Sequence, residues 1–288
     1  MKLRSINASL AALGLCACSA ATVETADVAE VSIETPAQPA EAPQPDRSEA
    51  LTDLPLVHFT PFPKPQVAQF SGSPLTLWST NYYTPIYETQ ADGIPLLDKN
   101  NQRLSGNLSR KQWCNVALQG AAALREPTGV VTAYVFADQN GPEQTNCDDR
   151  LGNLSDNIKR ATRKVRFSAV KHPYGCGVRN WPLIPYRTIA VDQNTIPYQT
   201  TLYIEALAGK IFEIDGQTYT HDGYVFAADK GGAIKGNHID FFSGNSQRVP
   251  FADVVTSNEN KSVKARIVSP ESTAARNLKA LHSKSCSG

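Results

Sequence analysis

Short β-strand segments separated by turn residues are the feature that most limits what this chain can fold into. Leu75–Thr80 alternates between apolar and polar residues, and Val130–Val135 is rich in β-branched residues and follows Gly129. Further segments of the same kind, bounded by Gly, Pro and Asn, cover residues 187–191, 201–204, 224–228, 238–242 and 265–268. Many short strands with such turns are typical of a barrel or a sandwich. The sequence therefore predicts a mainly β fold.

One helix is predicted, from Ser109 to about Leu124. Ser109 and Gln112 have the spacing of a capping box, in which each side chain bonds to the other residue's backbone N–H. One face of this helix is apolar at helical spacing, through Trp113, Val116, Ala117 and Leu124.

The charge balance argues against one class of partner. The chain has 28 Lys and Arg against 27 Asp and Glu, which gives a formal net charge of +1. Nucleic-acid-binding proteins concentrate Lys and Arg on one surface, and no such run stands out here. We therefore expect no nucleic-acid partner, and the sequence makes no prediction of oligomeric state.

The N-terminal residues have the pattern of a targeting segment. Lys2 and Arg4 precede an apolar stretch, residues 6–17, which is shorter than the roughly 20 residues that span a bilayer. The stretch runs into Leu15-Cys16-Ala17-Cys18-Ser19, which resembles the lipobox of bacterial lipoproteins. A cleaved secretory signal without a lipid is the alternative.

The lipobox resemblance implies that residues 1–18 are a lipoprotein signal peptide and anchor. Cys18 is then the lipidated residue, because a small residue, Ala17, precedes it. Several acyl chains, as in this class of lipoproteins, anchor a protein stably where one chain does not. Ser19 after the cysteine implies sorting to the outer membrane, so the expected location is the periplasm, on an outer-membrane anchor.

Residues 19–53 are predicted to be a disordered tether. This stretch is rich in Ala, Pro, Glu and Thr, contains no aromatic residue, and has Arg47 as its one basic residue. Such a composition cannot bury enough apolar surface to offset chain entropy, and its prolines favour an extended spacer. The folded domain is expected over residues 54–288.

The remaining cysteines suggest disulfide bonds. Without Cys16 and Cys18 four cysteines are left: Cys114, Cys147, Cys176 and Cys286. An even number in an exported protein indicates two disulfides, for which three pairings exist. None of the four has the Cys or His spacing of a zinc site, so we expect no metal and no cofactor.

Two aspartates flank a glycine-rich turn between predicted strands. Asp229 ends one strand, Gly231, Gly232 and Gly236 follow, and Asp240 lies in the next strand. Two carboxylates in unlike environments are a recurring arrangement for acid–base chemistry on a sugar acetal. The alternative is that both are turn residues that bond to nearby backbone N–H groups, and spacing alone favours that alternative.

A resemblance to a known family favours the catalytic interpretation of the two aspartates over the turn interpretation. Arg187-Thr-Ile-Ala-Val-Asp192, Ile196-Pro197 and Ala228-Asp229-Lys-Gly-Gly-Ala-Ile-Lys-Gly-Asn-His-Ile-Asp240 resemble the 3D domain, named for three aspartates. The similarity covers residues 186–244. It implies a double-psi β-barrel like that of the membrane-bound lytic transglycosylase A family. Residues 85–182 would then form a small helical or loop elaboration in place of that family's second domain.

The resemblance also implies a reaction. It identifies Asp240 as a single catalytic acid/base that cleaves the β-1,4 bond between N-acetylmuramic acid and N-acetylglucosamine in peptidoglycan and leaves a 1,6-anhydro sugar. Such an acid must be protonated at rest, so burial or a neighbouring carboxylate, with Asp229 the candidate, should raise its pKa. The implied partner is the peptidoglycan glycan strand. The alternative is a non-catalytic lipoprotein that binds peptidoglycan in the same groove.

The sequence departs from the family pattern at two positions. Lys230 stands where Thr is usual, and a cation that faced the cleft would favour ionised carboxylates and lower their pKa. A lysine that points into solvent would have no such effect. Gln199 replaces a usual Gly in the turn after Ile196-Pro197.

Six further residues are candidates for substrate binding. Tyr82 and Tyr83 are able to stack on sugar rings, although aromatic residues on strands more often belong to the core. Lys235 is a candidate ligand for a substrate carboxylate or acetamido group, with a solvated turn lysine as the alternative. His238 shares a strand face with Asp240, so it is a candidate to orient that acid or to bind a sugar hydroxyl, with a simple surface role as the alternative. Arg187 and Asp192 are expected to form an ion pair at the barrel seam.

Overall fold

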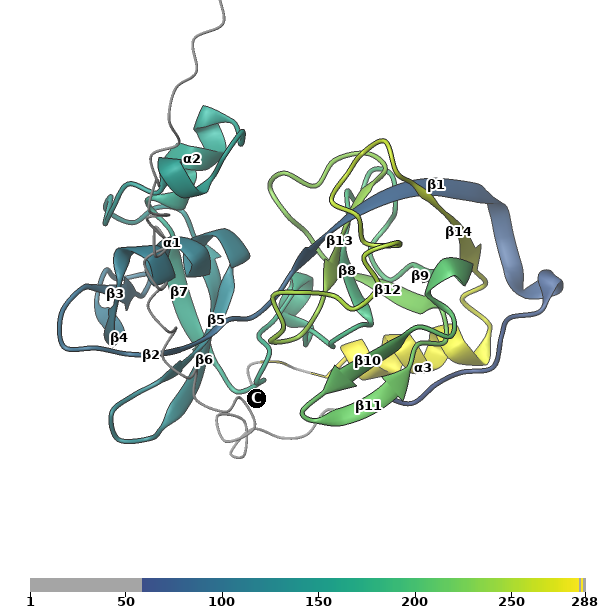
Figure 1. Ribbon diagram of the computed structural model, residues 1–288, viewed down its shortest axis with the longest axis horizontal. Coiled ribbons are helices and arrows are strands. Elements are labelled where there is room, and N and C mark those ends of the chain that lie inside the picture. The colour runs from purple at the N-terminus through teal and green to yellow at the C-terminus, as the bar shows by residue number, and fades with distance from the viewer. Residues whose placement is uncertain (1–58, 285, 287–288) are drawn as a thin grey trace, which may run out of the picture. The chain divides into compact units, whose positions relative to one another are not determined.

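The computed structural model describes residues 59–284 and 286, so the predicted signal peptide, Cys18 and the whole of the predicted tether lie outside the described residues. Within the described part, six strands form a closed barrel (Figure 1). The barrel order is β1 (Phe70–Tyr82), β13 (His238–Phe242), β8 (Thr188–Ala190), β12 (Tyr224–Asp229), β9 (Thr201–Tyr203) and β14 (Val263–Val268). The predictions of a mainly β fold and a barrel are confirmed.

Strand β1 closes the barrel because it pairs with two strands from the end of the chain. It runs parallel to β13, with Trp78 opposite His238 and Tyr82 opposite Phe242, and antiparallel to β14. Alternate residues of the strands, such as Leu77, Ile239 and Phe241, belong to the largest apolar cluster. Their neighbours along each strand point to the opposite face, and this second face carries the polar residues described below.

A buried ion pair ties the segment before β1 to the barrel. Arg187 is 2% exposed and binds both oxygens of Asp222, at 2.5 and 2.8 Å. Its guanidinium also donates to the Thr60 carbonyl at 2.8 Å and lies 3.6 Å from the Phe59 ring centroid. The predicted Arg187–Asp192 pair is therefore wrong, because Asp222 is the partner of Arg187. The pair gives Arg187 a structural role, and its role in substrate binding stays a prediction.

Residues between β1 and β8 form a separate set of strands and helices. A four-stranded sheet has the order β2 (Ile86–Glu88), β5 (Ala121–Arg125), β6 (Val131–Asp138) and β7 (Arg166–Val170), and β3 (Ile94–Leu97) pairs with β4 (Arg103–Leu108). The helices are α1 (Arg110–Gln119) and α2 (Asp156–Thr162). This region has its own apolar cluster around Trp113 and Phe167. The expected helical or loop elaboration is thus mostly β.

The predicted capping box at the start of α1 is confirmed, but the predicted end of the helix is wrong. The Ser109 hydroxyl accepts from the Gln112 N–H at 3.3 Å, and the Gln112 side chain accepts from the Ser109 N–H at 2.9 Å. Gly120 then takes a left-handed conformation with φ 76°, which ends the helix. The alanines that follow pair as β5 between β2 and β6.

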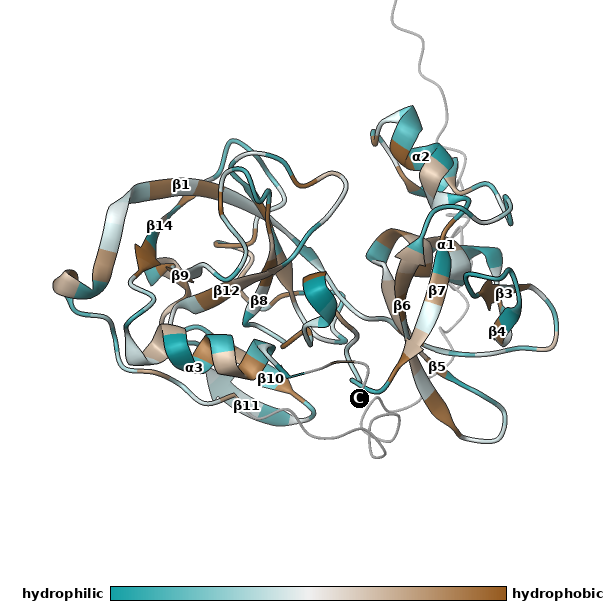
Figure 2. Cartoon of the chain, turned by 180° about the vertical axis from the view of Figure 1, so that it is seen from behind, coloured by the Kyte–Doolittle hydropathy of each residue, from teal (hydrophilic) through white to brown (hydrophobic). Residues whose placement is uncertain are grey.

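Two further strands and one further helix complete the fold. A hairpin joins β10 (Ile211–Ile214) to β11 (Gln217–Thr220), and α3 (Thr273–His282) follows β14. Helix α3 buries Ala274, Ala275, Leu278 and His282, and its ribbon alternates between hydrophobic and hydrophilic bands (Figure 2). No helix of the described part is long and apolar enough to cross a membrane.

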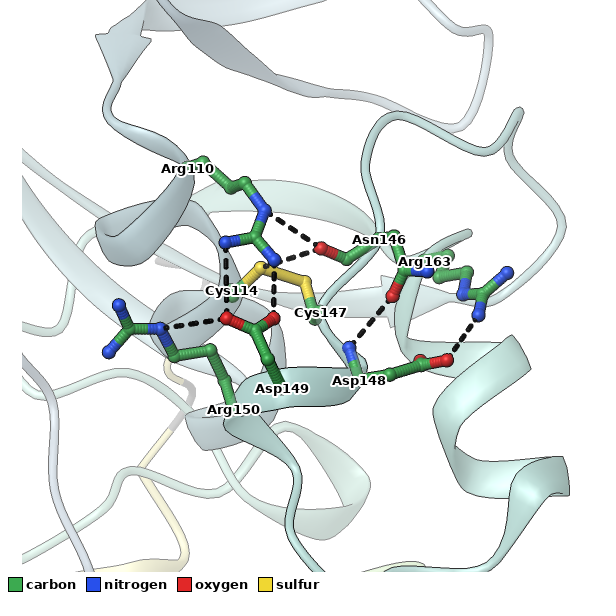
Figure 3. A network of polar contacts seen from close by, with 8 residues as sticks. All are labelled: Arg110, Cys114, Asn146, Cys147, Asp148, Asp149, Arg150 and Arg163. Carbon is green, nitrogen blue, oxygen red and sulfur yellow. Dashed lines mark hydrogen bonds and ion pairs between the residues drawn. A yellow bond between two sulfur atoms is a disulfide. The ribbon is translucent and has the colours of Figure 1, made fainter.

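The four cysteines form two disulfides, Cys114–Cys147 and Cys176–Cys286, with Cα–Cα distances of 5.5 and 5.9 Å. The prediction of two disulfides is confirmed, and the structure selects one of the three pairings. Figure 3 shows the polar contacts that surround the first disulfide. Arg110 pairs with Asp149, Arg163 donates to Asp148 at 2.6 Å, and the Asp148 N–H donates to the Asn146 side chain at 2.8 Å.

A local run of basic residues was overlooked in the sequence. Lys159, Arg160, Arg163, Lys164 and Arg166 lie within eight positions. Two of them are already paired, because Arg163 binds Asp148 and Arg166 makes a two-pronged contact with Asp138 at 2.7 and 2.9 Å. The run is therefore partly neutralised inside its own region, and the expectation of no nucleic-acid partner stays a prediction.

Replacing Arg187 by Ala should lower the free energy of unfolding by about 3–5 kcal/mol, because the Asp222 carboxylate stays buried without its cation. Urea unfolding at pH 7 measures this loss. Lys210→Ala is the matched control: it breaks an ion pair with Asp253 whose side chains are exposed, and such pairs contribute about 0–1 kcal/mol. Equal effects of the two substitutions would contradict the structural role of Arg187.

Candidate active site

Asp229 and Asp240 lie on strands that flank the same residue of β8. Asp229 is opposite Ala190 in the β12–β8 pair, and Asp240 is opposite Ala190 in the β13–β8 pair. Because neighbouring strands are about 4.8 Å apart, the two Cα atoms are separated by about 10 Å. The structure thus brings the two predicted acids to one patch of the barrel wall, and both residues are half-buried.

An irregularity in β12 orients Asp229. Strict alternation would place Asp229 on the same face as Ala227, which belongs to the barrel's apolar cluster. The register of β12 against β8 shifts between these two residues, and such β-bulges redirect side chains. Asp229 accordingly accepts a hydrogen bond from the Tyr82 hydroxyl at 2.8 Å. Tyr82 belongs to β1, so this contact passes over β13 and β8.

Burial is the main cause of the raised pKa of both acids. It raises the pKa of Asp229 to about 6, although hydrogen bonds from Tyr82 and from the Lys230 backbone N–H oppose the rise. It raises the pKa of Asp240 to about 7; the Thr80 hydrogen bond opposes this rise, and the charge of Asp229 adds to it. Asp240 therefore keeps its proton to a higher pH than an ordinary aspartic acid.

Lys230 has little influence on these carboxyl groups. Its side chain is exposed, and its charge is the smallest of the causes that act on the pKa of Asp229. It is not among the causes that shift the pKa of Asp240. Its backbone N–H donates to Asp229 Oδ1 at 2.8 Å, and threonine in this position would supply the same N–H.

Thr80 and His238 surround Asp240, and Thr80 was missed in the sequence. The Thr80 hydroxyl donates to Asp240 Oδ1 at 2.6 Å and lies 2.9 Å from His238 Nε2. The alternation Trp78-Ser79-Thr80-Asn81-Tyr82 places Thr80 on the same face as Tyr82, which was the signal available in the sequence. His238 is 7% exposed and stacks on Trp78.

The loop before β8 packs tightly against Asp229. A Cβ atom on Gly177 would lie 2.4 Å from the Ala228 carbonyl oxygen and 3.2 Å from Asp229 Cβ and Cγ. Glycine is therefore required for this close approach. The neighbouring Cys176 is bonded to Cys286, which holds the loop to the C-terminal residues. Gly177 and this disulfide thus help to desolvate Asp229.

The other predicted site residues are not joined to the two acids. Asp192 accepts from the Gly236 and Asn194 N–H groups at 3.0 Å each, which lowers its pKa and ties two turns together. Tyr83 accepts from Asn115 of α1, and Lys235 is an exposed turn residue. Their roles as substrate ligands stay predictions. In the described part, no group of three His, Cys, Asp or Glu could hold a metal ion.

Comparisons with known proteins agree with the motif. The 3D domain family model matches residues 187–251, which contain all three aspartates. The chain thus carries a 3D domain. No curated protein matches the chain.

Three solved structures that are similar to the chain are distant from it in sequence. E. coli MltA with bound chitohexaose is 20% identical, with 68% of this chain and 72% of that chain covered and a TM-score of 0.44. The membrane-bound lytic murein transglycosylase from Agrobacterium tumefaciens is 16% identical, with 71% and 78% covered and a TM-score of 0.46. The lytic transglycosylase LtgG of Burkholderia pseudomallei is 18% identical, with 67% and 71% covered and a TM-score of 0.35.

The raised pKa of Asp240 predicts a pH-dependent stability that Asp240→Asn should remove. Between about pH 4 and pH 7 the unfolded carboxyl loses its proton while the folded one keeps it, so the free energy of unfolding falls as pH rises. The Asn variant should therefore be more stable than the parent above pH 7, by about 1–3 kcal/mol, and the two should converge near pH 4. Urea unfolding at several pH values measures the difference.

Asp192→Asn is the control, because it should change the free energy of unfolding at neutral pH in the opposite direction. Hydrogen bonds lower the pKa of Asp192 in the folded chain, so its contribution to stability is present at neutral pH and lost on acidification. Its replacement should destabilise the chain at pH 7. The burial of Asp240 would be contradicted if Asp240→Asn lowered stability at pH 8 as Asp192→Asn does.

Proposed function

We propose that this chain, which carries a 3D domain at residues 187–251, is a lytic transglycosylase that cleaves peptidoglycan glycan strands. The observation that carries the proposal is the burial of Asp240 and the raised pKa that results from it. Asp240 is a half-buried residue, and burial raises the pKa of its carboxyl to about 7, with Asp229 two strands away. A group that gives and takes a proton in one reaction works best with a pKa near the working pH.

In the proposed reaction Asp240 acts first as acid and then as base. Protonated Asp240 gives its proton to the glycosidic oxygen as the bond from C1 of N-acetylmuramic acid to that oxygen breaks. The resulting carboxylate takes the proton from the C6 hydroxyl of the same sugar as O6 attacks C1. The products are a 1,6-anhydro-muramic end and a free 4-hydroxyl on N-acetylglucosamine, and Asp240 is protonated again. No water is consumed.

The neighbours of Asp240 support this cycle. The negative charge of Asp229 favours protonated Asp240 before the reaction. It also favours the positive charge that develops at the sugar C1 in an oxocarbenium-like transition state. Tyr82 donates to Asp229 and holds that carboxylate in place. We thus assign Asp229 an electrostatic role and Tyr82 a positioning role.

We further propose the double-psi topology for the six-stranded barrel and a lipid-anchored periplasmic location. The parallel pairs β1–β13 and β12–β8 within an otherwise antiparallel barrel support the topology. The Leu15–Ser19 pattern supports the location, with Cys18 as the lipidated residue on the outer membrane. Two disulfides in the folded part agree with an oxidising compartment.

Digestion of purified peptidoglycan tests the activity. The full chain should release 1,6-anhydro-muramic fragments, detected by mass spectrometry, and Asp240→Ala should reduce the rate about 10²–10⁴-fold through the loss of acid–base catalysis. Reducing ends without the anhydro mass would indicate hydrolysis. Intact strands that stay bound to the protein would indicate the non-catalytic alternative, and both outcomes would overturn the proposal.

Lys230→Thr should change the cleavage rate by less than about threefold, because the lysine charge has only a weak effect on Asp229. Rates for both proteins at equal substrate and salt measure this. Lys261→Thr is the matched control, because this lysine is also exposed and lies in the loop before β14, outside the candidate site. A large gain in cleavage rate for Lys230→Thr alone would show that the lysine charge lowers the activity of Asp229 and Asp240. That result would contradict the exposed position of its side chain.

A further inference from the structure

Strand β1 places two aromatic residues on the face of the barrel wall that carries Asp240. Thr80 is opposite Asp240 in the β1–β13 pair, and residues two apart on a strand share a face. Trp78 and Tyr82 therefore lie on either side of the acid, each about 7 Å along the strand from Thr80. One sugar unit of a β-1,4-linked strand has a similar length, so both aromatic residues lie where a sugar next to the scissile bond would bind.

Of these two residues, Trp78 is the one available to a ligand. Tyr82 is 8% exposed, and its hydroxyl donates to Asp229. Trp78 is half-buried and belongs to none of the four apolar clusters of the part that the structure describes. In the same part of the chain its indole N–H has no acceptor, and this N–H is not buried. The apolar core thus does not account for Trp78, and an accessible aromatic ring with a free donor suits a ligand site.

The ring of His238 supports one face of the Trp78 indole. The two ring centroids are 3.6 Å apart, and the ring planes differ by 8°. His238 is 7% exposed, and its ring is held by a hydrogen bond to the Ala233 backbone and by the 2.9 Å contact between Nε2 and Thr80 Oγ1. The indole therefore rests on a fixed support, so ligand binding has little ordering cost at this side chain.

We propose that Trp78, supported by His238, is a stacking platform for an N-acetylhexosamine ring in the subsite next to Asp240. The axial C–H groups of a β-linked pyranose ring lie against the indole face that His238 leaves free. The indole N–H donates to a hydroxyl or acetamido oxygen of the bound strand. This inference rests on the proposed function, because it takes the peptidoglycan glycan strand as the ligand.

The charges around the platform favour an uncharged sugar ring as its ligand. Burial lowers the pKa of His238, so the imidazole under the indole is neutral at pH 7. A nucleotide base would also stack on an indole, but its phosphates would bring negative charge beside the carboxyl groups of Asp229 and Asp240. A pyranose ring supplies apolar C–H groups to the indole and hydroxyl groups to its polar surroundings.

Binding to an inactive form of the full chain tests the platform. The chain with Asp240→Asn is titrated with a β-1,4-linked hexamer of N-acetylglucosamine. Adding Trp78→Ala should raise Kd about tenfold, the loss expected for one aromatic stack, whereas Trp78→Phe keeps a ring and should stay within about threefold. Phe136→Ala is the matched control, because it removes an exposed ring from β6, and it should leave Kd unchanged. An unchanged Kd in Trp78→Ala would overturn the platform.

Tryptophan fluorescence separates stacking on Trp78 from a loss of folding. The chain has three tryptophans, of which Trp113 is fully buried. The hexamer should change the emission of the Asp240→Asn chain, and this response should persist when Trp181→Phe is added. It should disappear when Trp78→Phe is added, although that variant still binds. A full response in the Trp78→Phe chain would place the sugar away from Trp78 and overturn the proposal.

Kinetics distinguish a binding role from an effect on the acid. A stack that forms equally in the ground state and the transition state changes KM and leaves kcat alone. Trp78→Ala in the otherwise unchanged chain should therefore raise KM for peptidoglycan about tenfold, with kcat within about threefold and an unmoved kcat–pH profile. A lower kcat with a shifted profile and an unchanged KM would show that Trp78 acts through His238 on Asp240, and would overturn the platform.

The failure of this inference and the failure of the proposed function give different results. Hexamer binding that depends on Trp78, without anhydro products from peptidoglycan, would leave the platform in place and overturn the reaction. Anhydro products with an unchanged KM in Trp78→Ala would leave the reaction in place and overturn the platform.

Discussion

The pairing of β1 with both β13 and β14 is the constraint on which the rest of the structure depends. It joins residues 70–82 to strands that follow more than 150 positions later, and it closes the six-stranded barrel. Without β1, β13 and β14 would each expose an unpaired edge, which favours aggregation. The same strand supplies Thr80 to Asp240 and Tyr82 to Asp229. Fold closure and the environment of both acids therefore come from one strand.

The candidate site buries two carboxyl groups without the paired cation that the buried carboxylate of Asp222 has. Arg187 and Asp222 are buried as a pair with further hydrogen bonds, so each charge is compensated. Among residues 59–284 no cation forms an ion pair with Asp229 or Asp240, and hydroxyl and N–H donors from Tyr82, Lys230 and Thr80 only partly replace water. The result is a raised pKa for both acids. A site that destabilises the charged carboxylate suits an acid that must hold a proton near neutral pH.

The region between β1 and β8 is stabilised largely by itself. It has its own apolar cluster, and the Cys114–Cys147 disulfide joins α1 to the loop that carries Asp148 and Asp149. The second disulfide has a different role, since Cys176 lies beside Gly177, which packs on Asp229. One disulfide thus supports the inserted region, and the other supports a wall of the candidate site.

The sequence by itself determined the features that depend on near neighbours in the chain. Alternation of apolar residues located β13 at residues 238–242, and Ser109 with Gln112 located the start of α1, because strand faces and helix caps are decided within a few positions. The 3D motif identified Asp240, Asp229 and Asp192. Gly120 was the local signal that was missed, and the helix prediction ran on into β5.

Only the tertiary structure decided which distant groups meet. Asp192 is 5 positions from Arg187 in the sequence, and Asp222 is 35 positions away. The fold nevertheless buries Arg187 beside Asp222, and a buried guanidinium needs a buried carboxylate as its partner. The cysteine pairing, the bulge that turns Asp229 toward Tyr82, and the position of Thr80 beside Asp240 likewise depend on strand register across the barrel. Packing of the whole barrel decides the strand register, so no local stretch of the sequence determines it.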